Sequence, residues 1–412
     1  MILLHISDLH FGKTLHECPL VEEDQPHWKE KFLELVDEIK PDAVLIAGDV
    51  YDRSTPSNEA VKLLDEFLTE LSAKDIAVLM VSGNHDSGQK LSFGSEIFEK
   101  QNVYISGVLR KELKSVTIND EYGPVTFWLM PYVFPALIAS VLEKEKMSDY
   151  DTAVRELLSA QNIDFSQRNV LIAHQNVVSE GREAQRGGSE TMIGGVGAID
   201  YKAFDGFTYV ALGHIHAAQY VGRKEVRYAG SPLCYHFSET RQSKKGPLLV
   251  EIGDKNDEVK ISTCLIEPIH QLREIVGKFD DVINSELKSE KRNEYIRVVL
   301  TDSNLKTDSA EKLRAVFESH GSKMLEIVNE PDFSEKTYTQ RENHGVKKNV
   351  GELFRDFFFE RSGEKTLDNK ENAIVEYLTN EVSEHIGEEK CGDPDDKAVD
   401  KFLEFIFDGE EY

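Results

Sequence analysis

The sequence predicts an α/β protein in which two β-sheets pack together, followed by a smaller α/β module and a group of terminal helices. Three observations lead to this fold class. Short runs rich in Ile, Val and Leu alternate with amphipathic helices, which is typical of strands covered on both faces of a sheet. From about Val103 the predicted strands are shorter and closer together, which indicates a second sheet. Near Pro268 the composition changes, which indicates a further module.

The first sheet is predicted from three strand–helix units. Each strand is a short apolar run, and each helix carries apolar residues at helical spacing, as Phe32, Leu35 and Ile39 do. Pro41 ends the first of these helices. In chain order, the elements are strand 2–7, helix 28–39, strand 43–47, helix 57–71, a strand that ends before Asn84, and a segment with regular apolar positions at 89–100.

The second sheet and the module are predicted from the same patterns. A glycine-rich stretch at 180–197 interrupts the second sheet, and a loop of that length is usually functional or disordered. Strands are expected at 115–118, 125–130, 170–173 and 208–212, and helices at 136–144 and 152–161. Two further strands, at 247–252 and 258–265, are expected after a turn at 228–232 and are not assigned to either sheet. The module reads in order as a helix, strand 295–300, helix 310–320 and strand 324–328.

The chain is too long for one ordinary hydrophobic core, so we expect several domains. Residues 1–268 form the main domain, 269–335 the small module and 349–412 the terminal helices, after a polar linker. The terminal helices carry apolar stripes, which usually mark a partner surface, although they could instead fold back on the body. The stripes are Leu353, Phe354, Phe357 and Phe358, then Ile374, Leu378, Val382 and Ile386, then Phe402, Leu403, Ile406 and Phe407.

Composition narrows the class of protein. The formal net charge of −27, from 75 acids and 48 bases, argues against nonspecific attraction to polyanions but leaves room for a local basic surface. The four cysteines are scattered without a Cys-x-x-Cys pair, which favours a reducing compartment over a disulfide framework or zinc knot. The N-terminal run lacks the pattern of a signal peptide, and no apolar run approaches the roughly 20 residues of a membrane span. A cytoplasmic location without membrane contact is expected.

Five of the predicted strands end on side chains that bind metals. Sites in open α/β sheets form beyond the carboxyl ends of the strands, so these side chains predict one shared site. Any one of them alone could be an ordinary polar loop residue, but the set follows five apolar runs in order. In chain order they are Asp8, His10, Asp49, Asn84, His174, His214 and His216.

Oxygen and imidazole ligands without sulfur suit Mn, Fe or Zn in an open catalytic site. Seven ligands exceed the need of one ion, and two ions sharing Asp49 fit the number. A pair about 3.5–4 Å apart can bind both ends of a phosphodiester displacement and lower the pKa of a bridging water. His85 follows Asn84 and is expected to stabilise the transition state or protonate the leaving oxygen, oriented by Asp86.

The motifs resemble those of the calcineurin-like metallophosphoesterases. The longer strings AGDVYDRSTPS, GNHDSGQKLSFGSE, DGFTYVALGHIH and YAGSPLCYHFSE look like the nuclease subunits of bacterial complexes related to the archaeal and eukaryotic break-repair nuclease. The close similarity covers about residues 1–240, and the remaining chain agrees in layout. The resemblance implies a two-sheet αββα sandwich with a capping domain at 269–330.

The resemblance also implies the roles of individual residues. One cation, usually manganese, would be held by Asp8, His10, Asp49 and His216, and the second by Asp49, Asn84, His174 and His214. His85 matches the catalytic histidine of the family. Two positions depart from the pattern: Ala173 precedes His174 where many relatives have Gly, and position 52 is Asp where archaeal relatives have a further His. A role of that His in strand opening is therefore not carried over.

The family's activities are 3′-to-5′ exonuclease action on double-stranded DNA and endonuclease action on single strands and hairpins, in repair, recombination and replication. An ATPase partner, bound through the C-terminal helices, controls access to the site. The helices near Leu64–Phe67 and Leu91–Phe98 resemble the family's homodimer contact, with ordinary core packing as the alternative. Five cations near the motifs are expected to touch DNA phosphates, although each singly could be a solvated surface charge. They are Lys13, Arg53, Lys90, Arg182 and Arg186.

Three functions compete on these observations. The leading hypothesis is a manganese-dependent DNA nuclease that works with an ATPase. A phosphatase or small-molecule phosphodiesterase could use the same dinuclear site, because fold and metals do not fix the substrate. The module and the terminal helices favour the nuclease, since an enzyme for small substrates has little need of them. A scaffold that has lost catalysis is the third possibility, and the complete ligand set with His85 argues against it.

Overall fold

The structure is a computed structural model of the 412-residue chain. It describes residues 1–179, 197–241, 245–288, 290, 292–302 and 308–330. The chain divides into two compact units, Met1–Phe333 and Ser334–Tyr412, and all described residues belong to the first. The predicted terminal helices at 349–412 lie outside the described residues.

The first sheet has six strands in the order β16-β15-β1-β4-β5-β6. Strands β1, β4, β5 and β6 are parallel, whereas β15 and β16 add an antiparallel edge beside β1. This edge brings a late part of the chain back to the first strand. The bounds are β1 Ile2–Ile6, β4 Ala43–Ala47, β5 Ala77–Val81, β6 Val103–Ser106, β15 Leu248–Glu251 and β16 Lys260–Thr263.

The second sheet also has six strands, in the order β13-β14-β12-β9-β8-β7. Its four central strands are parallel, and β13 and β7 are antiparallel edges. The bounds are β7 Lys114–Asp120, β8 Gly123–Met130, β9 Arg168–His174, β12 Tyr209–Gly213, β13 Gln219–Val221 and β14 Arg223–Tyr228.

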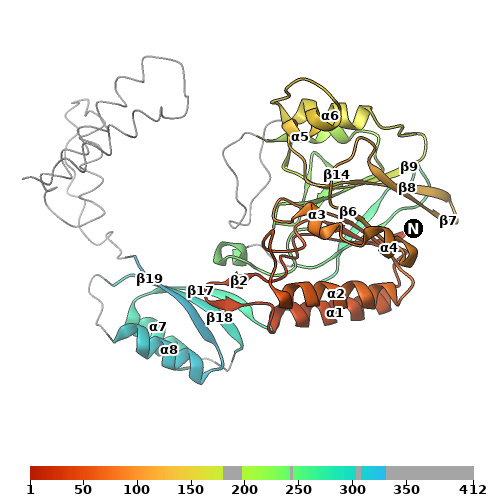
Figure 1. The fold of residues 1–412 in the computed structure, drawn as a ribbon. Helices are drawn as coiled ribbons and strands as arrows, with labels where there is room; N and C mark the ends of the chain where they lie inside the picture. The colour runs from red at the N-terminus through yellow and green to blue at the C-terminus, as the bar shows by residue number, and fades with distance from the viewer. Residues whose placement is uncertain (180–196, 242–244, 289, 291, 303–307, 331–412) are drawn as a thin grey trace, which may run out of the picture. The chain divides into compact units, whose positions relative to one another are not determined.

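The two sheets and their helices form four layers. Helices α1 (Asp24–Ile39) and α2 (Asn58–Ser72) lie side by side on the first sheet, and α5 (Pro135–Val141) and α6 (Tyr150–Ser159) cover the second (Figure 1). A separate apolar cluster fills the space between the sheets. Successive strand residues point to opposite faces, so Leu3 packs between the sheets while Leu4 packs under the helices. The predicted αββα sandwich is confirmed.

Short elements complete the main body. Two two-stranded pieces lie outside the large sheets, and short helices follow several strands. The pieces are β2 Thr14–Leu15 with β3 Cys18–Pro19, and β10 Val177–Val178 with β11 Ile199–Asp200. The short helices are α3 Gly88–Leu91, α4 Ser95–Phe98, η1 Glu99–Gln101, η2 Tyr201–Phe204 and η3 Phe237–Arg241.

The small α/β module has three parallel strands in the order β17-β18-β19, with two helices and an apolar cluster of its own. Its contact with the main body includes Asp24, whose carboxylate accepts a hydrogen bond from Tyr295 Oη and lies 2.9 Å from His270 Nδ1. The boundary at residue 268 remains a prediction. The bounds are β17 Gln271–Gly277, α7 Phe279–Glu286, β18 Glu294–Leu300, α8 Ser309–Ser319 and β19 Lys323–Asn329.

Several expected elements differ from the structure. The module opens with strand β17, not with a helix, because residues such as Leu272 and Ile275 at helical spacing pair along the full length of β18. The second sheet begins at β7, since β6 completes the first sheet, and the β13–β14 hairpin was not expected. Helix α1 starts at Asp24, because Pro26 is tolerated in the first turn, where the N–H has no helical partner. Among the described residues, none of the helices is long and apolar enough to cross a membrane.

Candidate metal centre

The seven predicted ligands meet at the carboxyl edge shared by the two sheets. Asp8 and His10 follow β1, Asp49 follows β4 and Asn84 follows β5. From the second sheet, His174 is the last residue of β9, and two histidines follow β12. Strands β1, β4 and β5 are parallel in the first sheet, and β9 and β12 are parallel in the second. In each sheet the carboxyl ends of these strands therefore lie at one edge. The described ligands are largely buried, Asn84 being the exception.

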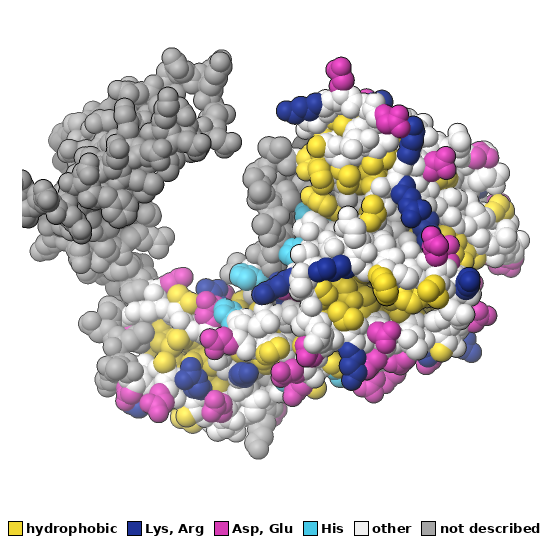
Figure 2. All heavy atoms as spheres, viewed as in Figure 1, with side chains coloured by type: hydrophobic (Ala, Val, Ile, Leu, Met, Phe, Trp, Pro, Cys, Tyr) yellow, Lys and Arg dark blue, Asp and Glu magenta, His cyan; other side chains and the backbone are white. Residues whose placement is uncertain are grey.

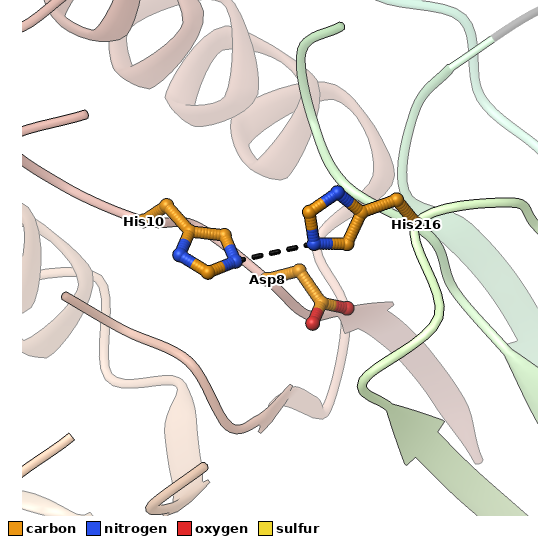
Figure 3. A group of neighbouring side chains, drawn as sticks. All are labelled: Asp8, His10 and His216. Atoms are coloured by element: carbon orange, nitrogen blue, oxygen red, sulfur yellow. Dashed lines mark hydrogen bonds between the residues drawn. The ribbon is translucent and has the colours of Figure 1, made fainter. Parts of the chain in front are cut away.

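Asp8, His10 and His216 form the first group of potential ligands, with donor atoms close enough together to hold a metal ion. His10 Nε2 and His216 Nε2 face each other at 3.2 Å, with Asp8 beside them (Figure 3). Ser7 Oγ donates to Asp8, and the backbone N–H of His214 donates to Asp8 Oδ1 at 3.0 Å. The first strand of one sheet and the loop after β12 of the other thus build this group together.

The second group lies around Asn84. Its Oδ1 atom is 3.0 Å from His174 Nε2 and 3.0 Å from His214 Nδ1. Asp49 connects the two groups, because its Oδ2 atom lies 3.3 Å from His174 Nε2 and 3.6 Å from His10 Nε2. One carboxylate oxygen is therefore shared between histidines of both groups, as the predicted bridging role of Asp49 requires.

Glycines before the ligands let these loops approach one another. A Cβ atom at Gly48 would lie 2.4 Å from His174 Nδ1, and one at Gly83 would lie 2.1 Å from Asp49 Oδ1. At Gly213 a Cβ would meet the carbonyl oxygen of Ala47 at 1.9 Å. The Gly-Asp, Gly-Asn and Gly-His pairs of the sequence thus have a steric cause: a side chain at the glycine would fill the space that the neighbouring ligand occupies.

Residues outside the motifs hold the ligands in position. His174 Nδ1 lies 2.8 Å from the carbonyl oxygen of Ala47, which directs Nε2 toward the site. Glu239 Oε1 lies 3.3 Å from His216 Nδ1. Gln25, in the first turn of α1, donates to the carbonyl oxygen of His10 and accepts from the N–H of Gly12. Such outer contacts fix the orientation of metal-binding side chains.

Burial and charge perturb the ionisable groups at the centre. Burial alone would raise the pKa of Asp49, but His174 and His10 outweigh it and hold that pKa well below its usual range. Burial opposes protonation of His174 as well, yet the charge of Asp49 raises its pKa to about 9. Burial, together with His174, lowers the pKa of His214 to about 4. Without cations, His174 is therefore protonated near neutral pH, and a cation that binds there must displace its proton.

His85 lies beside the two groups. Its backbone N–H donates to Asp49 Oδ1 at 2.9 Å, and its ring centroid is 4.8 Å from that of His10. We expected Asp86 to orient the ring, and this expectation is wrong: His85 Nδ1 lies 2.8 Å from the carbonyl oxygen of Asp52. The Asp86 carboxylate accepts instead from the backbone N–H groups of Val50, Tyr51 and Gly83.

Asp86 therefore joins the loop after β4 to the loop after β5. Burial, with the charge of Asp49, raises the pKa of Asp86 to about 6. Asp52 is a further residue of this region whose role the sequence did not reveal. Its carboxylate pairs with Lys13 Nζ at 2.8 Å and lies 3.6 Å from His10 Nδ1.

The predicted DNA-contacting cations differ in their surroundings. Lys13 is paired with Asp52, and Lys90 Nζ donates to the carbonyl oxygen of Ser54 and to a neighbouring threonine hydroxyl. Arg53 Nε lies 3.6 Å from Asp52 Oδ2, but its side chain is 80% exposed, against 21% for Lys13. Arg53 is therefore more accessible to a substrate than Lys13. Arg182 and Arg186 lie outside the described residues.

The supporting roles of Glu239, Gln25 and Asp52 were not predicted from the sequence. None of these residues ends an apolar run, and none stands at a ligand spacing. Glu239 does lie within the string YAGSPLCYHFSE, but a single Glu in a loop predicts no contact. Its complete burial is visible only in the structure.

Comparison with known proteins places the chain in a family. Residues 1–218 match the calcineurin-like phosphoesterases, and residues 268–362 match a domain described as the type 5 capsule protein repressor C-terminal domain. The D subunit of nuclease SbcCD from Staphylococcus epidermidis is 32% identical over 320 residues, which cover 77% of this chain and 83% of that protein. The corresponding nuclease protein of Staphylococcus saprophyticus is 30% identical over 384 residues, with 92% and 98% covered.

Among solved structures, the protein TT1561 of Thermus thermophilus aligns over 64% of this chain and 98% of its own. Its TM-score of 0.37 and 10% identity are too low to bear on the site. The family matches agree with the two buried His/Asp groups at the sheet edge. The chain therefore belongs to the calcineurin-like phosphoesterases and, among them, to the family of SbcD nuclease subunits.

Proposed function

We propose that the chain is the nuclease subunit of an SbcC–SbcD complex and cleaves DNA phosphodiester bonds with two divalent cations, Mn²⁺ above all. The observation that carries this proposal is the position of Asp49, whose Oδ2 atom lies 3.3 Å from His174 Nε2 and 3.6 Å from His10 Nε2. One shared carboxylate between two ligand groups is the arrangement that a dinuclear centre needs. The two Staphylococcus relatives are nuclease subunits, which supports DNA as the substrate.

The residues present fit two cations. His10 Nε2 and His216 Nε2 converge at 3.2 Å in a buried place beside Asp8, where imidazole and carboxylate donors meet without a thiolate. Asp8, His10, Asp49 and His216 would hold one cation, and Asp49, Asn84, His174 and His214 the other. When bound, the cations supply Lewis-acid polarisation of the phosphate and of the attacking water.

His85 is the proposed general acid. A carbonyl oxygen can only accept, so the Asp52 carbonyl requires the proton on His85 Nδ1 in the neutral ring. Within the described part of the chain, Nε2 of this ring has no hydrogen-bond partner. Once the ring is protonated, Nε2 can therefore donate a hydrogen bond to the phosphate or a proton to the leaving oxygen. Asp49 Oδ1 fixes the backbone of His85 and so ties this group to the cation sites.

The test is cleavage of an end-labelled DNA hairpin and duplex with Mn²⁺, comparing wild type with His85→Gln. We expect cleavage of both substrates by the wild type and a loss of about 10²–10⁴-fold in the variant, with metal binding retained. Labels at the 3′ and 5′ ends report the expected 3′-to-5′ polarity. Turnover of an aryl phosphodiester without DNA cleavage would instead support a small-molecule phosphodiesterase or phosphatase. No turnover of either substrate would support a scaffold.

We further propose that the helices predicted at 349–412 bind the SbcC-type ATPase, in the cytoplasm. The supporting observations are the apolar stripes in the sequence of that segment and the nuclease complex named in the relatives. Leu378→Asp combined with Val382→Asp should abolish co-purification with the ATPase. Turnover of an aryl phosphodiester should remain, because the ligand set is untouched. Retained binding would contradict this role of the helices.

A homodimer is proposed through the face formed by α2, α3 and α4. Figure 2 shows hydrophobic side chains gathered on this side of the molecule. A hollow of about 520 Å³ lies there, lined in part by Leu64 and Phe93. Phe93 is 86% exposed and Ile97 69%, which is unusual for such side chains. Phe93→Glu should convert the dimer to a monomer in sedimentation experiments. Tyr220→Glu, at another exposed aromatic, is the matched control and should leave the dimer intact.

A further inference from the structure

A buried carboxylate lies directly behind one of the proposed cation ligands. Glu239, in η3, has no exposed surface, and its Oε1 atom is 3.3 Å from His216 Nδ1. The opposite nitrogen of the same ring, Nε2, faces His10 Nε2 at 3.2 Å. The imidazole of His216 is therefore placed between the carboxylate of Glu239 and the centre of the site.

The contact specifies which nitrogen of His216 carries the proton. An ionised carboxylate can only accept hydrogen bonds, so Nδ1 of His216 must be the donor. In the neutral ring, Nε2 is then left with its lone pair directed at the first ligand group. This is the form of imidazole that a cation needs.

Lys245 and Ser231 hold Glu239 in this position. Lys245 Nζ lies 2.8 Å from Glu239 Oε2, and it donates to the carbonyl oxygen of His216 at 3.0 Å. It also donates to Ser231 Oγ at 2.6 Å, and the N–H of Ser231 donates to the same His216 carbonyl. One largely buried network therefore fixes both the ring and the backbone of His216. The lysine also compensates a carboxylate that would be costly to bury alone.

We propose that Glu239, held by Lys245, is a positioning residue for His216 and selectively supports the cation site of Asp8 and His10. The inference rests on the proposed function in assuming two cation sites. It adds that one of them depends on a carboxylate outside the ligand motifs. In the other site the histidine is oriented by a backbone group and not by a carboxylate, since His174 Nδ1 lies against the carbonyl oxygen of Ala47. A change at position 239 should therefore separate the two sites.

The experiment is calorimetric titration of the metal-free full chain with Mn²⁺, together with electron paramagnetic resonance of the loaded protein. Wild type should bind two ions and show the signal of a spin-coupled pair. Glu239→Gln should weaken one site by about 10–100-fold and leave the other within about twofold. At stoichiometric Mn²⁺, its spectrum should be that of isolated ions. Glu286→Gln, at a buried glutamate paired with Arg273 in the module, is the control and should match the wild type.

Glu239→Asp is a second variant in case the glutamine variant folds poorly. It keeps the charge beside Lys245 but withdraws the carboxylate from the ring by about one bond length, roughly 1.5 Å, so it should show the same selective loss. Two tight, coupled sites in both variants would overturn the inference, and so would equal weakening of both sites. A wild-type chain that binds no Mn²⁺ would refute the metal centre itself, and the inference with it.

Discussion

Substitution of Gly83 by alanine tests whether the geometry around Asp49 matters for catalysis. Gly83 precedes Asn84 in the turn after β5, and its α-carbon faces Asp49. An added Cβ would lie 2.1 Å from Asp49 Oδ1 and 2.3 Å from the Asp49 backbone nitrogen. Ordinary contacts begin near 3.4 Å, and one of the two atoms is backbone that cannot rotate away. The loops after β4 and β5 must therefore separate by about 1 Å.

The expected effect follows from the distances that Asp49 makes. Its Oδ2 atom lies 3.3 Å from His174 Nε2 and 3.6 Å from His10 Nε2, so a shift of about 1 Å removes it from one group. Misplacement of that size costs about 10²-fold in rate. A 100-fold loss in kcat/KM corresponds to about 2.7 kcal/mol of transition-state stabilisation.

The assay is cleavage of the labelled hairpin over a range of Mn²⁺ concentrations, with circular dichroism to verify folding. Gly277→Ala is the matched control, because its Cβ would meet only Val282 Cγ2 at an ordinary 3.4 Å. The control should retain wild-type turnover and metal dependence. If Gly83→Ala remained folded and cut DNA at the wild-type rate, catalysis would not depend on the close approach of these loops or on the position of Asp49.

Three further predictions concern cations, pH and the module. Chelation should lower the thermal midpoint, because cations at 100 times their dissociation constant add about 2.7 kcal/mol to the free energy of unfolding, and an unchanged midpoint would exclude binding. In the chelated protein, burial disfavours the charged form of His174, yet Asp49 raises its pKa from 6.5 to about 9. The stability gained below pH 6.5 should therefore be lost as the pH rises toward 9, and urea denaturation showing equal or greater stability at pH 9 would contradict this. Asp24→Asn should cost about 1–3 kcal/mol of unfolding free energy, because the buried carboxylate contacts Tyr295 Oη and His270 Nδ1 with its two oxygens, whereas an amide has only one. The exposed Asp280→Asn should cost little in the same assay.

The position of the site could be predicted because strand ends are local in sequence. An apolar run that stops at Asp, Asn or His predicts both where a strand ends and which polar side chain lies at that end. The carboxyl ends of neighbouring parallel strands lie at one edge of the sheet. Asp8, Asp49 and Asn84 are therefore found together on one sheet, as expected from their runs. That the histidines of the second sheet reach the same edge depends on the packing of the two sheets, which the closer spacing of the strands after Val103 indicated and the resemblance also implied.

The supporting residues could not be predicted, because their partners are distant in sequence. Glu239 is 23 positions from His216, and Gln25 is 15 positions from His10. Both act through contacts that only the folded chain creates. The error at Asp86 has the same origin: adjacency to His85 in sequence favoured a side-chain contact, whereas the turn directs the carboxylate to backbone N–H groups.

The backbone at the site is strained where the predicted ligands lie. Asp8, His10, Asp49 and His214 all have positive φ, a conformation that costs about 1–3 kcal/mol each and persists only where the surroundings impose it. Here the N–H of Asp8 donates to the carbonyl oxygen of Gly48, that of His10 to the carbonyl oxygen of Asp49 and that of His214 to the Asp8 carboxylate. Hydrogen bonds between the loops thus hold them in this conformation at the ends of two buried sheets. Chelation should therefore lower the midpoint of unfolding without abolishing the cooperative transition, because the cores, and not the metals, sustain the strained loops.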